Sequence, residues 1–181
     1  MVLVVGSMPH GEHFVSNNNS FRIGNKVSKN QECCITVNVA KMPLSTVGAL
    51  VVNPSDKVLL VLTHKWKNTW GVPGGKINYG ENLRAALVRE IREETSLEIN
   101  NIRWAPTQEM VLSELFYRPA HFILLNFIAC SNSEEVTLNE EAQDYAWVFP
   151  NDALAYELNE PTRCLINYFI KHGHTGNRLD P

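Results

Sequence analysis

Hydrophobic and polar positions predict alternating strands and helices from about residue 45 onward. Apolar runs rich in β-branched residues and leucine are typical of strands, and we also interpret the short run around Trp147 as a strand. They occupy residues 46–52, 57–64, 102–112, 120–130 and 144–149. Segments of good helix formers, one of them with Pro161 at a first helical position, predict helices. They occupy residues 81–95, 152–158 and 161–172. This order predicts an α/β (α+β) sandwich, a mixed sheet flanked by helices.

The first part of the chain has a different composition. Residues 7–32 are rich in Asn, Ser, Gly and Lys and follow neither the helical nor the strand period. We therefore expect an N-terminal arm over residues 1–44 that is flexible in part, a folded domain over 45–172 and a C-terminal tail over 173–181. Deletion of residues 1–30 is expected to leave the fold and the chemistry of the domain intact.

The predicted helix at 81–95 changes character along one face. At about 100° per residue, an aliphatic stripe is continued for another turn by three glutamates. The stripe consists of Leu83, Ala86 and Leu87, followed by Glu90, Glu93 and Glu94. A solvated polar face is the ordinary interpretation of such glutamates. Here apolar Val88 and Ile91 lie beside them, which favours a face turned toward a site.

Three carboxylates at this spacing repel one another and need a compensating charge. Arg89 can pair with Glu93 one turn further on, but one arginine cannot neutralise three carboxylates. Mg²⁺ or Mn²⁺ can, because both take shells of carboxylate, water and phosphate oxygens. The segment has no His or Cys, which argues against zinc.

A glycine pair precedes this helix. In Gly71-Val72-Pro73-Gly74-Gly75 the proline and the glycines predict a special loop without a regular element. Gly74 and Gly75 would let the backbone approach a metal or a phosphate closely. The segment is not a P-loop, because Lys76 is followed by Ile77.

From Gly75 the chain reads GKINYGENLRAALVREIREETSL, which resembles the Nudix box, G-x5-E-x7-R-E-U-x-E-E-x-G-U. Eight of its nine fixed positions match. They are Gly75, Glu81, Arg89, Glu90, Ile91, Glu93, Glu94 and Leu97. Ser96 stands where the family has Gly, a position expected to cap the helix, so the substitution bears on the cap more than on the chemistry.

The resemblance covers about residues 45–172 and implies a Nudix-like α/β/α sandwich. It also implies metal-dependent hydrolysis of a pyrophosphate bond in a nucleoside diphosphate linked to another moiety. A nucleotide sugar, an ADP-ribose-like compound and a nucleoside triphosphate all satisfy this description, so the substrate stays open. The alternative is a non-catalytic nucleotide-sensing or regulatory module on the same fold, which would be expected to lose part of the carboxylate set.

Residue roles follow from the resemblance. Glu90 and Glu94 are the expected principal metal ligands, with Glu93 as a further ligand or the base and Gly75 contributing its backbone. Arg89 is expected to orient the carboxylates during catalysis, and Glu81 and Gly74 to support them. The base stays open between Glu93 and Glu141. We favour Glu141 as the base or an additional metal ligand, because Arg89 can hold Glu93, whereas a carboxylate in a loop can turn toward a metal-bound water molecule.

Candidate substrate contacts lie outside the box. Lys65 and Arg118 could meet phosphate, and His121 opens an apolar strand. Aromatic side chains near the predicted site could stack on a base or ribose, although core packing is their more frequent role. They are Trp66, Trp70, Tyr79, Phe116 and Tyr117.

Composition narrows the partners. The 181 residues, 44% hydrophobic, suit one domain. A net charge of −3 provides no general basic field, so neither a nucleic acid nor an anionic membrane is an expected partner. Removal of an RNA cap, for example, would predict a basic groove. We expect a small-molecule nucleotide as the partner and leave a homodimer open.

The same reasoning gives an expected compartment. No run approaches the about 18 apolar residues of a membrane span, and the opening MVLVVG lacks the features of a signal peptide. Cys33, Cys34, Cys130 and Cys164 match no zinc spacing and are typical of thiols in a reducing compartment. We expect a cytoplasmic protein.

Overall fold

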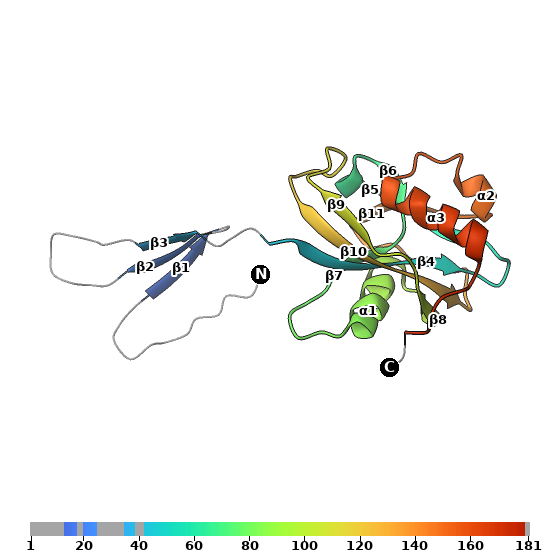
Figure 1. Cartoon of the computed structure of the whole chain (residues 1–181), viewed down its shortest axis with the longest axis horizontal. Helices are drawn as coiled ribbons and strands as arrows, with labels where there is room; N and C mark the ends of the chain where they lie inside the picture. Colours follow the sequence, from blue (N-terminus) through green and yellow to red (C-terminus); the bar gives the residue numbers. More distant parts are fainter. Residues whose placement is uncertain (1–12, 18–19, 25–34, 39–41, 180–181) are drawn as a thin grey trace. The chain divides into compact units, whose positions relative to one another are not determined.

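The computed structural model describes residues 13–17, 20–24, 35–38 and 42–179, and the chain forms two compact units, 1–42 and 43–181 (Figure 1). In the first unit, β1 (His13–Asn17), β2 (Ser20–Gly24) and β3 (Ile35–Asn38) form an antiparallel sheet in that order. The prediction that residues 7–32 lack a regular element is wrong for β1 and β2. Asn17 pairs with Ser20, so only two residues connect β1 to β2, a length typical of a β-hairpin. The polar composition of this segment does not show the alternation by which a strand is recognised.

The second unit contains eight strands and four helices within the described residues. The strands are β4 (Leu44–Val52), β5 (Val58–Thr63), β6 (Thr69–Gly71), β7 (Gly74–Lys76), β8 (Ile99–Trp104), β9 (Gln108–Val111), β10 (His121–Ser131) and β11 (Ala142–Val148). The helices are η1 (His64–Trp66), α1 (Leu83–Thr95), α2 (Pro150–Ala153) and α3 (Glu160–His172). Along the part of the chain that is described, no helix is both long and apolar enough to cross a membrane.

The strands form one mixed sheet in the order β11-β5-β4-β10-β8. The central pair β4 and β10 is parallel, and the other pairs are antiparallel. The short strands β6, β7 and β9 pair antiparallel with β5, β4 and β10, respectively. Helix α1 covers one face of the sheet, and α2 and α3 cover the other (Figure 1).

The side chains of β4 point alternately to the two faces of the sheet and contribute to both hydrophobic layers. Val47, Ala49 and Val51 pack on the same side as the apolar stripe of α1, whereas Leu50 and Val52 pack with the side chains of α3. Successive residues of a strand point to opposite faces, so a strand buried on both faces is hydrophobic throughout. The predicted sandwich, a mixed sheet flanked by helices, is confirmed.

Two predicted elements differ from the structure. The single strand predicted at 102–112 is two strands, β8 and β9, because Pro106 lies between them and has no N–H to donate to the sheet. The helix predicted at 152–158 is only the four residues of α2. Beyond it the chain continues in single turns, with the Tyr156 N–H donating to the Ala153 carbonyl.

The end of the described chain lies along the sheet. The Trp104 N–H donates to the Asn177 carbonyl at 2.9 Å, and the Leu179 N–H donates to the Ile102 carbonyl at 3.0 Å. Residues 177–179 of the predicted tail therefore cover the outer side of β8, which would otherwise be an open edge.

Both ends of α1 are capped. The Asn82 side chain accepts the Ala85 N–H at 2.8 Å, as expected of an N-cap. Ser96 adopts the left-handed conformation, with φ of 60°, and its N–H donates to the Arg92 carbonyl at 2.8 Å. The cap that glycine forms in the Nudix box therefore forms here with serine, and α1 ends directly after its glutamates.

Candidate active site

Gly74 and Gly75 belong to β7, where they pair with Gly48 and Val47 of β4. The expectation that this segment excludes a regular element is wrong. Gly74 has a φ of 151°, and a Cβ there would overlap the Val47 carbonyl oxygen and lie 2.6 Å from the Gly48 Cα. Glycine permits this close approach of two backbones, so β7 fits between β4 and the glutamate end of α1.

Glu94 is anchored to this strand. Its carboxylate, only partly exposed, accepts the Gly74 N–H at 2.8 Å. Burial raises the pKa of Glu94 to about 7; the Gly74 N–H acts in the opposite direction, and the negative charge of Glu90 raises the pKa further. The site therefore disfavours a charged Glu94 unless a cation compensates it.

Glu90, one helical turn before Glu94 in α1, packs against the same strand. Its side chain is 15% exposed, and a Cβ on Gly75 would overlap its carboxylate. The Arg89 Nη1 donates to its Oε1 at 2.7 Å. The Glu90 and Glu94 carboxylates thus both lie against β7, and Gly75 leaves the space that Glu90 occupies.

Arg89 ties the helix to the loop that precedes it. Its Nε and Nη2 each donate to the Glu81 carboxylate at 2.8 Å, and Nη2 also donates to the Lys76 carbonyl at 3.0 Å. The Arg89 hydrogen bond, together with the Asn78 N–H, lowers the pKa of Glu81 to about 2, and the pairing raises the pKa of Arg89. Two parallel hydrogen bonds fix orientation as well as charge, so Glu81 and Arg89 hold Glu90 in place.

Glu93 occupies a different position. Its side chain is 56% exposed and accepts a hydrogen bond from the Arg89 Nη1 at 3.2 Å. Among the described residues, no three His, Cys, Asp or Glu side chains converge on a point that could hold a metal ion. The donors that β7 brings together are Glu90, Glu94 and its own backbone.

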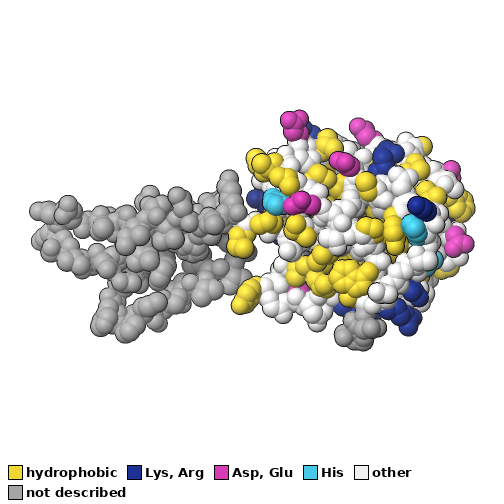
Figure 2. Space-filling model, in the orientation of Figure 1, with side chains coloured by type: hydrophobic (Ala, Val, Ile, Leu, Met, Phe, Trp, Pro, Cys, Tyr) yellow, Lys and Arg dark blue, Asp and Glu magenta, His cyan; other side chains and the backbone are white. Residues whose placement is uncertain are grey.

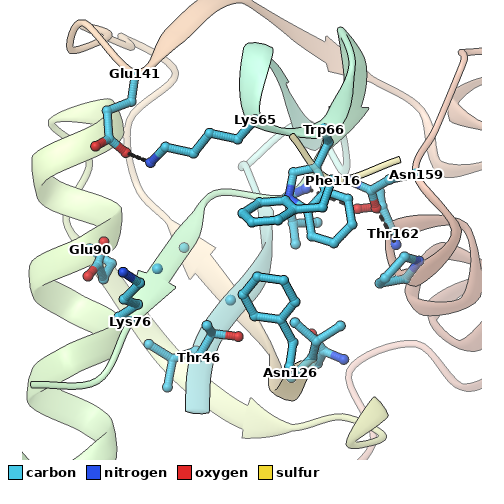
Figure 3. Close-up of a pocket in the computed structure, with 18 of the residues that line it drawn as sticks. Thr46, Lys65, Trp66, Lys76, Glu90, Phe116, Asn126, Glu141, Asn159 and Thr162 are labelled. Carbon is cyan, nitrogen blue, oxygen red and sulfur yellow. Dashed lines mark hydrogen bonds and ion pairs between the residues drawn. The ribbon is translucent and has the colours of Figure 1, made fainter. Parts of the chain in front are cut away.

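A pocket of about 380 Å³ opens beside these carboxylates (Figure 3). Charged side chains line one end, and aromatic and amide side chains line the other. The charged residues are Lys65, Lys76, Glu90 and Glu141. The others include Trp66, Phe116, Phe122, Asn126, Asn159 and Thr162. One cavity therefore joins an ionic region to a region of aromatic and uncharged polar side chains.

A family model described as the NUDIX domain matches residues 42–169. The chain belongs to the Nudix hydrolase family. It is 36% identical over 100 residues to nucleoside triphosphatase NudI of Escherichia coli K12, an alignment that covers 52% of this chain and 71% of NudI.

Solved Nudix structures share the fold. The MutT NUDIX hydrolase of Burkholderia pseudomallei superposes with a TM-score of 0.62 at 23% identity, over 71% of this chain and 98% of that one. The NUDIX domain of Shewanella oneidensis NrtR, solved with ADP ribose, gives a TM-score of 0.62 at 23% identity, over 73% of this chain and 89% of that one.

The candidate substrate residues divide into two groups on this Nudix fold. Lys65, Trp66 and Phe116 line the pocket. The other candidates lie outside its lining: Tyr79 is fully exposed, Arg118 stands over the Tyr117 ring at 5.6 Å, and His121 pairs with Glu109 at 2.8 Å.

Several lining residues were not among the candidates, including residues with polar side chains. Asn126 lies on β10, Lys76 on β7, and Asn159 and Thr162 at the start of α3. The only sequence signal among them is the helix start at Asn159, whose side chain accepts the Thr162 N–H at 3.0 Å. Their place in the pocket depends on packing between distant segments, since Thr162 Oγ1 accepts the Val72 N–H at 3.1 Å.

The surface of the Nudix domain carries mixed charge. Figure 2 shows acidic and basic side chains dispersed among hydrophobic ones on the visible face, without a basic band.

The raised pKa of Glu94 predicts a pH-dependent stability. Between pH 4.5 and about 7 the folded state binds more protons at Glu94 than the unfolded state does, so the contribution of Glu94 to stability falls as pH rises through this range. In excess chelator, Glu94→Gln is expected to raise the free energy of unfolding by ~2 kcal/mol at pH 8, an amount reduced by solvent screening, and by little at pH 4.5. Urea melts at both pH values measure this.

Glu140→Gln is the control, because Glu140 is exposed and its replacement is expected to change the free energy of unfolding by less than about 0.5 kcal/mol at either pH. An equal effect of Glu94→Gln at both pH values would show that burial does not perturb this carboxylate.

Proposed function

We propose that this Nudix hydrolase cleaves a pyrophosphate bond of a nucleoside triphosphate, or of a nucleoside diphosphate linked to another moiety, with Mg²⁺ or Mn²⁺. The observation that carries the proposal is that one pocket joins the Glu90 end to the Trp66 and Phe116 end. A nucleotide has the same two parts, a polyanion and a flat base. The likeness to nucleoside triphosphatase NudI favours the triphosphate.

The donor set fits a hard divalent cation. Family members typically depend on divalent metals, and the carboxylates of Glu90 and Glu94 lie together against β7. Glu90 pairs with Arg89, whereas the charge of Glu94 is not compensated, as its raised pKa indicates. Glu90, Glu94 and the backbone of Gly75 would hold the ion. Mg²⁺ keeps several water and phosphate ligands, so a third carboxylate is not required. When bound, the ion neutralises charge on the phosphate oxygens.

The remaining side chains supply position and proton transfer. Lys65 and Lys76 would meet phosphate oxygens at the charged end. Glu141 would accept the proton of the attacking water, because it lines the pocket whereas Glu93 does not. Trp66 and Phe116, whose ring centroids are 4.8 Å apart, would form the apolar wall for a base.

A substrate screen tests the proposal. Nucleoside triphosphates, nucleotide sugars, ADP-ribose-like compounds and dinucleoside polyphosphates are each incubated with Mg²⁺ and with Mn²⁺, and the products are separated by chromatography. Hydrolysis of at least one class at a pyrophosphate bond is expected, with triphosphates preferred. Binding of nucleotides without hydrolysis of any class would favour the sensing module instead.

A further inference from the structure

Lys65 connects three segments at one side of the pocket. Its carbonyl accepts the Tyr117 N–H at 2.9 Å, and its N–H donates to the Thr63 side chain at 3.2 Å. Its ammonium group pairs with the carboxylate of Glu141, whose own N–H donates to the Asn139 side chain at 2.9 Å. The backbones of Lys65 and Glu141 are thus held in place, whereas their side chains are 44% and 51% exposed and can move.

The ion pair lies beside the carboxylates of the proposed metal site. Lys65, Glu141 and Glu90 line the same pocket, and Figure 3 shows the Lys65 side chain extended toward Glu141, on the side of the pocket formed by α1. Glu141 is therefore close to this site but engaged with Lys65.

We propose that Lys65 is a positioning residue: it holds Glu141 in the substrate-free enzyme and releases it when a phosphate of the substrate binds the ammonium group. This inference rests on the proposed function and adds an order of events to it. Binding of phosphate to Lys65 and release of Glu141 are then coupled, and each event makes the other more favourable.

The physical chemistry of the pair suits such an exchange. An exposed ion pair contributes little net free energy, so it can be broken by a modest competitor. A phosphate chain offers more negative charge than one carboxylate and forms stronger charge-assisted hydrogen bonds. Lysine carries its charge on a flexible stem, which lets the ammonium group move between Glu141 and a phosphate in the same pocket.

Binding of Mn²⁺ to the substrate-free full chain tests the inference without reference to turnover. Free Mn²⁺ is measured by electron paramagnetic resonance for wild type, Lys65→Met, Glu141→Gln and the double variant. Lys65→Met keeps most of the aliphatic stem and frees Glu141, so it is expected to tighten Mn²⁺ binding about threefold. Lys65→Arg keeps the pair and is expected to retain the wild-type Kd.

The double variant separates release of Glu141 from loss of a repelling charge. In the Glu141→Gln background, Lys65→Met is expected to gain less than half of its wild-type effect. Lys76→Met is the matched control: it removes another cation of the pocket and is expected to have the same effect in both backgrounds. An equal gain from Lys65→Met in both backgrounds would overturn the proposal.

An anion supplies the second arm. Sodium sulfate, a stand-in for phosphate, is compared with sodium chloride at equal ionic strength. Sulfate is expected to tighten Mn²⁺ binding about twofold in wild type and to have no such effect in Lys65→Met; the same response in both proteins would contradict the exchange. Absence of Mn²⁺ binding in every protein would count against the proposed function itself, whereas binding without coupling to Lys65 would reject only the positioning role.

Discussion

Glu90→Gln is expected to lower kcat at least about 100-fold, the scale of removing one preorganised electrostatic group. The Glu90 carboxylate lies against Gly75, receives a hydrogen bond from Arg89 and is largely shielded from solvent. Glutamine has the same shape but no charge, so the variant should fold while losing the attraction for a cation. Steady-state kinetics at saturating Mg²⁺, with a thermal melt of the same preparation, measure both.

Glu98→Gln provides the control for this variant. Glu98 pairs with Arg92 beyond the end of α1, and both side chains are exposed, at 67% and 63%. Its replacement is expected to leave kcat within about twofold of wild type, since exposed pairs contribute little. A Glu90→Gln protein that folds and keeps wild-type kcat would show that the charge of Glu90 is not needed for catalysis. A variant that no longer folds would show that Glu90 is structural.

Glu141→Gln is expected to lower kcat about 100-fold, within the range for removal of a general base, whereas Glu93→Gln is expected to retain most of the activity. Glu141 lines the pocket. Glu93 is 56% exposed and is held by Arg89, so it is poorly placed to accept a proton from water in the pocket. The measurement is kcat across pH 6 to 9 for both variants.

The reverse outcome has a clear meaning. If Glu141→Gln keeps near-wild-type kcat over this pH range while Glu93→Gln loses it, the base lies on α1 and the exposed Glu93 must turn inward when substrate binds.

The sequence was sufficient for the elements whose pattern is local. Periodicity predicts the glutamate stripe of α1 and the apolar runs of β4, β5 and β10. A strand buried on both faces has a continuous apolar run, and an amphipathic helix has apolar residues at helical spacing. The Arg89 to Glu93 pair was likewise predictable from its spacing of four residues.

Contacts between distant segments could not be predicted in the same way. The two-point pairing of Arg89 with Glu81 depends on the path of the loop before α1. Asn159 and Thr162 reach the pocket because the start of α3 packs against Val72. The prediction that Gly74 lies outside any regular element was wrong. Glycine at this position allows β7 to pair closely with β4.

Metal-dependent product formation tests the central claim most directly. A nucleoside triphosphate is incubated with the full chain in Mg²⁺ and, in parallel, in excess chelator, and the nucleotide and phosphate products are quantified. Cleavage of a pyrophosphate bond to nucleoside monophosphate and pyrophosphate is predicted with Mg²⁺, with loss of nearly all turnover in chelator. Undiminished turnover in excess chelator would contradict the account, because Glu90 and Glu94 would then have no cation to hold.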